Sequence, residues 1–128
     1  MKNNKPIVAV DFDRVIHSDT NSDSEKEWHV VKDPPVPGAI DWLFNMVLGT
    51  RYKIVIHTCR ASSIRARIAM IQWLRNNGLP DAVIKQIEIT RIKPQAHIYI
   101  DDRAWCFKGE FPNVWEINAF KPWNKKGD

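Results

Sequence analysis

The sequence is poor in the cysteines that crosslink small secreted proteins and in the long apolar runs that cross membranes. Its 128 residues include two cysteines, Cys59 and Cys106, which are too few for a disulfide framework and lack the spacing of a zinc site. We expect both to be reduced and partly buried. The apolar run 7–10 is too short for a signal peptide, and no run approaches the roughly 20 residues that cross a bilayer. These absences favour a soluble cytoplasmic protein with no membrane partner.

Signatures of several nucleotide-binding and zinc-binding classes are also missing. Neither G-x-G-x-x-G nor G-x-x-x-x-G-K-[ST] occurs, so the dinucleotide-binding and P-loop classes are not expected. The histidines form no i, i+4 pair with one another, which disfavours a zinc site. His57 directly precedes Thr58 in a predicted strand, so its side chain should point to the opposite face, where core packing is the better interpretation.

Charge is unevenly distributed along the chain. Residues 11–33 hold three basic and seven acidic residues, a balance of −4, whereas the whole chain carries +4. The remaining residues therefore carry +8, from sixteen basic and eight acidic residues. A basic surface around an acidic mouth suits an anionic substrate, although the same asymmetry also serves solubility.

Three short apolar runs do not alternate with polar residues, which is typical of strands buried on both faces of a parallel sheet. They are Ile7–Val10, Ile54–Ile56 and Ile98–Ile100. Weaker strand patterns lie at 86–89 and 114–117. Between the strong runs, apolar residues recur at helical spacing on two predicted helices: Ile40, Leu43, Phe44 and Val47 on the first, and Ile64, Ile68, Ile71 and Leu74 on the second.

Start and stop signals bound these two helices. Gly49 suits the end of the first, Ser62 or Ser63 could cap the start of the second, and Gly78 suits its end. Strands that alternate with helices predict an α/β protein. We expect one domain over residues 1–128, a three-layer Rossmann-like open parallel sheet with helices on both faces.

Two polar segments fall outside this pattern. Residues 14–33 have no clear period and are too long for a simple crossover, and loops of that length often act as lids or flaps. Residues 121–128 form a basic tail that we expect to be frayed.

Each strong apolar run ends in polar residues at its carboxyl side. In open α/β sheets the ligand binds outside the carboxyl ends of the strands, so these residues should converge although they lie far apart in sequence. Lys93 lies just before the third run and is close enough to reach the same place. The residues at the strand ends are Asp11 with Asp13, then Thr58, then Asp101 with Asp102.

Such a set of side chains suits phosphoryl transfer. Four carboxylates in a small volume repel one another unless a cation is present, and oxygen ligands without a histidine pair favour Mg²⁺. A carboxylate held near Mg²⁺ can attack phosphorus to give an aspartyl-phosphate, and a second Asp two residues on can protonate the leaving oxygen. Thr58 offers a hydroxyl and Lys93 a positive charge to the phosphoryl oxygens.

The four motifs, in this order, resemble those of the haloacid-dehalogenase-like (HAD) phosphohydrolase superfamily, and the resemblance covers nearly the whole chain. The first motif is an apolar strand followed by Asp-x-Asp, the second a strand ending in Ser or Thr, the third a Lys and the fourth a strand ending in an acidic pair. Here they are Asp11-Phe12-Asp13, Thr58, Lys93-Pro94 and Asp101-Asp102. The stretches 33–40 and 100–107 look like those of small members found in bacteria and phages.

The resemblance implies a nucleophile at Asp11 and a general acid/base at Asp13. It also implies phosphate contacts from Thr58 and Lys93, and an Mg²⁺ ion held by Asp11, the carbonyl of Asp13, Asp101 and Asp102. We expect further substrate contacts from Phe12, Cys59, Arg14 and Arg60. Too few residues separate the motifs for a cap domain, so segment 14–33 would be the only flap.

One departure from the family pattern concerns Arg14, where the family commonly has Gly. Gly tolerates backbone angles that Arg does not, so either the turn is altered or Arg14 reaches a substrate anion. Arg14 also supports an alternative, a catalytically weak or inactive phosphate-binding module. A response-regulator receiver is disfavoured, because there the acidic pair comes first.

The substrate class stays open at this level between small phosphomonoesters, nucleotides and the end of a nucleic acid. Trp28 lies in the predicted flap and could stack on a base, although a stacking platform needs more than one aromatic side chain in an open groove.

Overall fold

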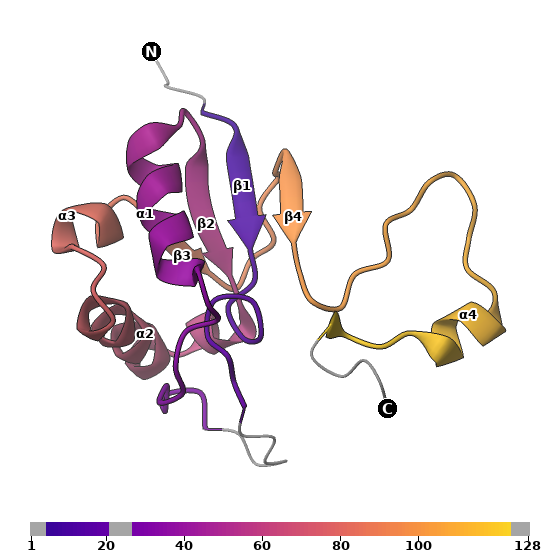
Figure 1. Ribbon diagram of the computed structural model, residues 1–128, viewed down its shortest axis with the longest axis horizontal. Helices are drawn as coiled ribbons and strands as arrows, with labels where there is room; N and C mark the ends of the chain where they lie inside the picture. Colours follow the sequence, from indigo (N-terminus) through magenta and orange to yellow (C-terminus); the bar gives the residue numbers. More distant parts are fainter. Residues whose placement is uncertain (1–4, 21–26, 124–128) are drawn as a thin grey trace.

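The computed structural model describes residues 5–20 and 27–123, and these form an α/β fold on a four-stranded, all-parallel sheet (Figure 1). The strands are β1 (Ile7–Val10), β2 (Lys53–His57), β3 (Glu88–Thr90) and β4 (Ile98–Ile100), in the order β3-β2-β1-β4. The three strong apolar runs are thus confirmed as strands, and the weaker pattern at 86–89 corresponds to β3, which begins two residues later and ends one residue later.

Register places the ends of the two central strands and of β4 side by side. Val10 of β1 pairs with Ile56 of β2 and with Ile100 of β4. The residues that follow these three therefore leave the sheet at the same side, at the carboxyl ends of the strands, as the sequence predicts for the motif residues.

Local signals explain where the first two helices lie. Helix α1 (Ala39–Gly49) begins after Gly38, whose φ of 88° lies in the left-handed region that favours glycine, and it ends at Gly49 as predicted. A 3₁₀ turn, η1 (Cys59–Ser62), precedes helix α2 (Ile64–Asn76). Of the two candidate caps, Ser63 caps α2, since its side chain accepts a hydrogen bond from the backbone of Ala66.

The buried face of α2 matches the predicted one only in part, because Leu74 is buried and Ile71 packs against the core, but the other two predicted residues do not. Ile64 and Ile68 are 71% and 55% exposed, whereas the buried residues are Ala66, Met70, Trp73 and Leu74. Two overlapping stripes on this helix have apolar residues at helical spacing. The stripe with Met70 and Trp73 offers more apolar area, so it faces the core.

The core joins α1, α2 and the short helix α3 (Asp81–Ile84) to one face of the sheet. Its cluster contains alternate strand residues such as Val8, Val10, Ile54 and Ile56, together with residues of all three helices. The connection 91–97 runs from β3 at one edge of the sheet to β4 at the other. In the described residues we therefore find sheet-packed helices on one face, where we expected them on both.

Only parts of the predicted flap and tail belong to the described residues. From the flap, 14–20 and 27–33 are described, and backbone bonds tie this segment to the chain that follows, from Ser18 to Pro34 and from Val36 to Ile16. From the tail, 121–123 are described, and 124–128 lie outside the described residues.

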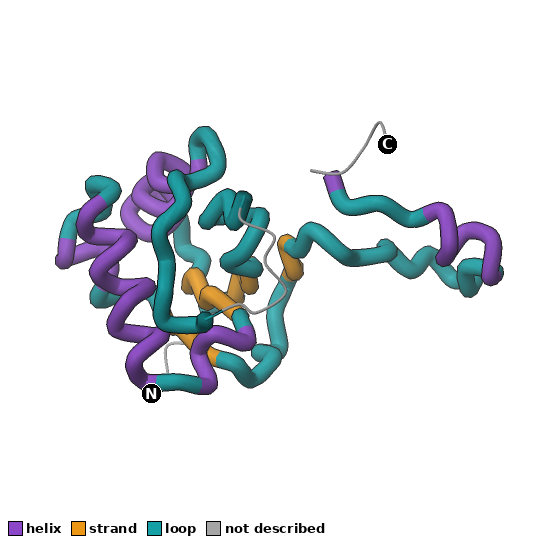
Figure 2. Tube along the Cα trace, turned by 90° about the horizontal axis from the view of Figure 1, so that it is seen from below, coloured by secondary structure: helices purple, strands orange, loops and turns teal. Residues whose placement is uncertain are grey.

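After β4 the chain leaves the sheet as an arm, residues 103–122, that projects away from the strands and helices (Figures 1 and 2). The predicted strand at 114–117 is wrong, because these residues begin helix α4 (Val114–Ala119). Asn113 and Glu116 form a reciprocal capping box, which stabilises a helix start. In the described ranges no helix has the length and apolarity needed to span a membrane.

Candidate functional site

Three carboxylates meet at the carboxyl edge of the sheet. Asp11 follows β1, and Asp101 and Asp102 follow β4; one oxygen of each lies within 4.8 Å of the others. The backbone N–H of Asp11 donates to the carbonyl of Ile100 at 2.9 Å, which holds the ends of the two strands together. The sequence-based prediction that these residues converge is confirmed.

Proximity changes the titration of this acidic group. Burial, a hydrogen bond with Asp102 and the charge of Asp101 raise the pKa of Asp11 to about 8. Burial opposes ionisation of Asp102 too, but the hydrogen bonds with Arg14 and Asp11 and the charge of Arg14 together outweigh it and lower the pKa of that carboxyl. Without a cation the group therefore retains a proton on Asp11 at neutral pH, and a cation would favour its ionised form.

A cavity of about 590 Å³ opens beside the acidic group, and Asp11 and Asp101 form part of its wall. Lys93 also lines it, with Nζ held 4.6 Å from the centre of the Tyr99 ring. His57 lines the same cavity, so the prediction that it packs in the core is wrong. The structure thus brings Lys93 and the acidic group to one space, as the sequence predicts.

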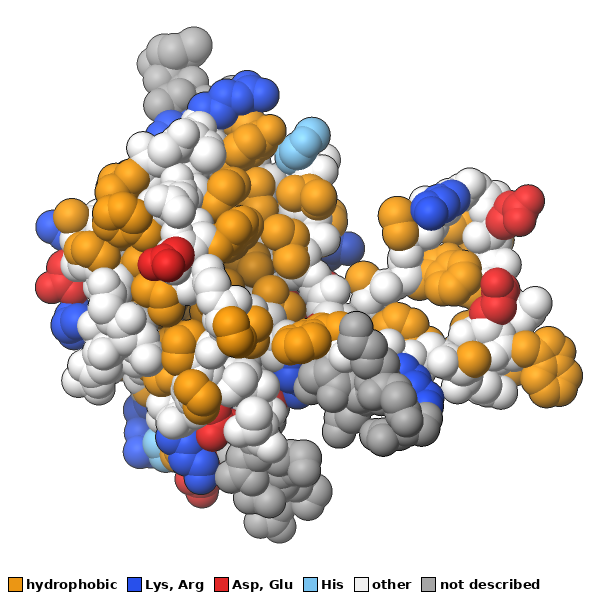
Figure 3. All heavy atoms as spheres, in the orientation of Figure 1, with side chains coloured by type: hydrophobic (Ala, Val, Ile, Leu, Met, Phe, Trp, Pro, Cys, Tyr) orange, Lys and Arg blue, Asp and Glu red, His pale blue; other side chains and the backbone are white. Residues whose placement is uncertain are grey.

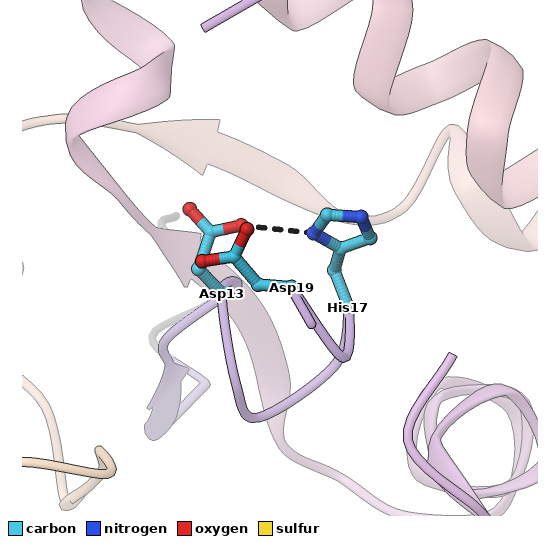
Figure 4. A group of neighbouring side chains, drawn as sticks. All are labelled: Asp13, His17 and Asp19. Atoms are coloured by element: carbon cyan, nitrogen blue, oxygen red, sulfur yellow. Dashed lines mark hydrogen bonds and ion pairs between the residues drawn. The ribbon is translucent and has the colours of Figure 1, made fainter. Parts of the chain in front are cut away.

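Asp13 belongs to a different cluster. It is buried, and Arg60 Nε donates to its two carboxylate oxygens at 2.9 and 3.1 Å. Its Oδ1 also lies 2.9 Å from His17 Nδ1, and Asp19 completes the group (Figure 4). The side chains of Asp11 and Asp13, two residues apart on a turn, therefore serve separate clusters.

Arg60 ties this second cluster to the flap. Its side chain is 1% exposed, and Nη1 donates to the carbonyls of Trp28 at 2.7 Å and Val30 at 3.2 Å. The guanidinium carbon also lies 5.6 Å from the centre of the Trp28 ring. Arg60 thus makes these contacts within the protein, where the sequence predicted a contact with substrate, and Trp28 packs against its guanidinium.

His17 is fixed in one tautomer by its two partners. Its Nε2 accepts a hydrogen bond from the backbone N–H of Asp33 at 3.2 Å, so the proton belongs on Nδ1, which donates to Asp13. The imidazole stacks on Phe12 and meets Trp73 edge-on. His17 therefore acts as a structural donor to Asp13 in this arrangement.

Arg14 adopts the conformation that its position demands. Its φ of 68° lies in the left-handed region, which is why Gly suits this place in the motif. Its Nε donates to Asp102 at 2.9 Å and its Nη1 to Asp19 at 2.8 Å. Arg14 thus links the acidic group to the buried cluster, and its contacts here are with carboxylates of the chain.

The other predicted contact residues lie at the ends of β1 and β2. Phe12 has a fully buried side chain, but its backbone N–H donates to Asp11 Oδ1 at 2.8 Å. Thr58 is buried, and its hydroxyl oxygen accepts from the backbone N–H of Arg60 at 3.3 Å, which caps η1. Cys59 and Cys106 are free and exposed, so the prediction that they are partly buried is wrong.

Within residues 5–20 and 27–123, two groups of side chains have the geometry to bind a metal ion, and the buried group Asp13, His17 and Asp19 is one of them. There, however, Arg60 and Arg14 already supply positive charge to both carboxylates. In the group of Asp11, Asp101 and Asp102 the guanidiniums of Arg14 and Arg103, at 2.9 and 3.8 Å, reach the same carboxylate, Asp102, and the oxygen donors suit a hard cation. We therefore regard the second group as the better cation site.

Searches of protein-family models, curated proteins and solved structures each found no match to this chain.

Sequence reasoning missed Asp19, and it missed the ion pair between Arg60 and Asp13. No periodicity marks Asp19, since it lies in the segment without a pattern. Arg60 did carry a signal: it follows Thr58 by two residues, which in an extended chain places the two side chains on the same side.

Proposed function

We propose that this protein is a Mg²⁺-dependent phosphatase of the HAD type, without a cap domain, that acts in the cytoplasm on a phosphomonoester. The observation that carries the proposal is the group of Asp11, Asp101 and Asp102, placed at the mouth of a cavity that Lys93 also lines. A carboxylate with a raised pKa beside a cavity, as Asp11 has here, is typical of a functional site. The order of the motifs along the chain supports the same class.

In the proposed reaction Asp11 is the nucleophile. Bound Mg²⁺ would neutralise the acidic group and the phosphoryl oxygens. An oxygen of Asp11 forms a bond to phosphorus, the bond to the leaving oxygen breaks, and that oxygen takes a proton from Asp13. Water then attacks phosphorus and gives a proton back to Asp13, which releases phosphate and restores Asp11.

Asp13 is held in this structure by Arg60 and His17, so its role requires that it exchange one of these donors for the substrate. Lys93 contributes positive charge to the phosphoryl oxygens, and Thr58 contributes its hydroxyl.

For the substrate, we propose a nucleotide or the end of a nucleic acid over a smaller phosphomonoester. The cavity of about 590 Å³ falls within the range typical of sites for molecules larger than phosphate itself. Tyr99 and Trp105 line it, and aromatic walls suit a base.

A second candidate function is a phosphate-binding module with weak or no turnover. The ion pair from Arg14 to Asp102 favours it, because a guanidinium on one carboxylate competes with a cation there. The two functions differ in whether phosphate is released.

The test measures inorganic phosphate released from a panel of nucleotides, sugar phosphates and 3′- or 5′-phosphorylated oligonucleotides, with and without Mg²⁺. We expect Mg²⁺-dependent release that disappears in Asp11→Asn and persists in Asp41→Asn, a matched change at an exposed residue of α1. Release that survives in Asp11→Asn would remove Asp11 as the nucleophile. Binding of phosphate and Mg²⁺ without release from any compound would favour the binding module.

A further inference from the structure

The arm exposes far more apolar surface than a solvated segment normally does. In residues 103–122 seven large apolar side chains are each at least 41% exposed. They are Trp105, Phe107, Phe111, Val114, Trp115, Ile117 and Phe120. No residue of α4 is buried. Contiguous exposed apolar surface of this kind marks an interaction site.

Both ends of the arm are fastened to the same residue of the body. Asp102, just before the arm, accepts a hydrogen bond from Arg14 Nε, and Trp123, just after it, donates from Nε1 to the Arg14 carbonyl at 2.8 Å. The arm is therefore a loop closed at its base. Its far part, with α4, projects away from the rest of the molecule in both views (Figures 1 and 2).

The body has an apolar groove of its own. A cavity of about 310 Å³ lies between the start of α1 and the ends of β1 and β4, and none of the described residues that line it is charged. Its wall includes Val15, Val36, Pro37, Trp42 and Ile100. Figure 3 shows hydrophobic side chains gathered on this face of the body, between the elements labelled α1 and β4 in Figure 1, and again on the arm.

We propose that two copies of this chain form a dimer in which α4 of each copy docks in the apolar groove of the other. Each chain carries both an apolar arm and an apolar groove, and the fastened base keeps them apart within one copy. A reciprocal pair covers both surfaces at once and closes on itself by two-fold symmetry. The arm carries three basic and two acidic residues, so its net charge is +1, and charge repulsion between two copies is small.

The available area suits a stable dimer. Phe107, Phe111, Trp115 and Phe120 are 55%, 85%, 76% and 41% exposed, and a buried aromatic side chain covers about 150–250 Å², so these four offer about 500 Å². A specific interface buries about 800 Å² on each partner. Trp115 lies on α4 and the other three flank it on the arm, so in a reciprocal pair these side chains alone supply more than half of an interface of that size.

The test is sedimentation velocity of the full chain over a micromolar concentration series, with one variant on each side of the contact. Trp115→Glu places a charge on α4, and Pro37→Glu places one in the groove, at an exposed residue just before α1, where an acidic residue suits the helix start. Ile64→Glu is the matched control, because Ile64 is an exposed apolar residue in the first turn of α2. Thermal melts check that all variants fold.

We expect a wild-type dimer, about a 30-fold or larger rise in the dimer Kd for either Glu variant, and no change for Ile64→Glu. An equal mixture of Trp115→Glu and Pro37→Glu should associate more than either variant alone, because one intact arm then meets one intact groove. A wild-type monomer at every concentration would overturn the proposal. So would a dimer that survives Pro37→Glu, which would indicate arm-to-arm contact, or a mixture that associates no more than its components.

Discussion

Removing the Arg60 guanidinium should destabilise the protein more than any change in an exposed ion pair. We consider Arg60→Met, which keeps much of the side-chain volume and removes the charge. In the native protein this group donates to both oxygens of Asp13 and to two flap carbonyls, and its side chain is 1% exposed. The variant leaves Asp13 with His17 as its remaining side-chain donor among the bonds described above.

The size of the effect follows from burial. Breaking a buried ion pair by removing one partner costs about 3–5 kcal/mol, because the remaining charge stays in a poorly solvated place. For a domain of this size that loss lowers Tm by roughly 10–20 °C. The exposed pair of Arg75 and Asp81 is the matched comparison, with side chains 49% and 65% exposed. Arg75→Met should cost less than about 1 kcal/mol.

The assay is urea unfolding at pH 7 followed by circular dichroism, on the wild type and both Met variants. A double variant, Arg60→Met with Asp13→Asn, should recover part of the loss, since it removes the buried carboxylate charge that Arg60 no longer compensates. A loss below about 1 kcal/mol for Arg60→Met, or equal losses for Arg60→Met and Arg75→Met, would refute the view that Arg60 compensates buried carboxylates.

Three further predictions test other parts of the structure. The metal-free protein should lose stability as pH rises from about 4 to about 8. The pKa of Asp11 is raised from 3.8 to about 8, so in this range the folded chain holds a proton that the unfolded chain has released. The Tm measured in EDTA should therefore fall with pH, and it should fall less in Asp11→Asn. Arg14→Ala should be less stable than Arg14→Gly by about 1–2 kcal/mol. Both variants lose the same ion pairs, but at a φ of 68° the backbone is strained with Ala and not with Gly. Equal urea midpoints for the two variants would contradict this. Met70→Ala should cost about 2–5 kcal/mol, whereas Ile68→Ala should cost well under half as much, and similar losses would mean that the buried face of α2 is misplaced.

Much of the fold and the acidic group follows from the sequence. Apolar runs that do not alternate predict strands buried on both faces, and β1, β2 and β4 lie where those runs lie. In a parallel sheet the residues after such strands share one edge, so the meeting of Asp11 with Asp101 and Asp102 needs only the strand assignment.

The errors arise where two local patterns compete. On α2 the isoleucine stripe and the stripe through Met70 and Trp73 have the same spacing, and only contact with Phe12 and the strands decides between them. At 114–117 the β-branched residues suggest a strand, but Asn113 and Glu116 carry a capping-box signal that predicts the helix.

The division of the Asp-x-Asp motif between two clusters lies beyond sequence reasoning. Residues 11 and 13 share a side in an extended strand, yet the chain turns at Phe12, and Asp13 is drawn to Arg60, 47 positions along the chain. No local pattern encodes a pairing of that separation. The left-handed backbone of Arg14 is the conformation that Gly tolerates at this place, and the family pattern did not predict that Arg14 would adopt it too.

The most direct test of the central claim is to look for the phosphoryl group on Asp11 itself. The protein is mixed with Mg²⁺ and with a phosphomonoester that it hydrolyses in the panel assay. The reaction is quenched in acid within the first turnover, and the protein is analysed by peptide mass spectrometry. We predict a phosphorylated peptide that contains Asp11, with the modification absent in Asp11→Asn and present in Asp41→Asn. Turnover with no phosphorylated peptide at any quench time, or a phosphoryl group on another residue, would contradict the assignment of Asp11 as the nucleophile.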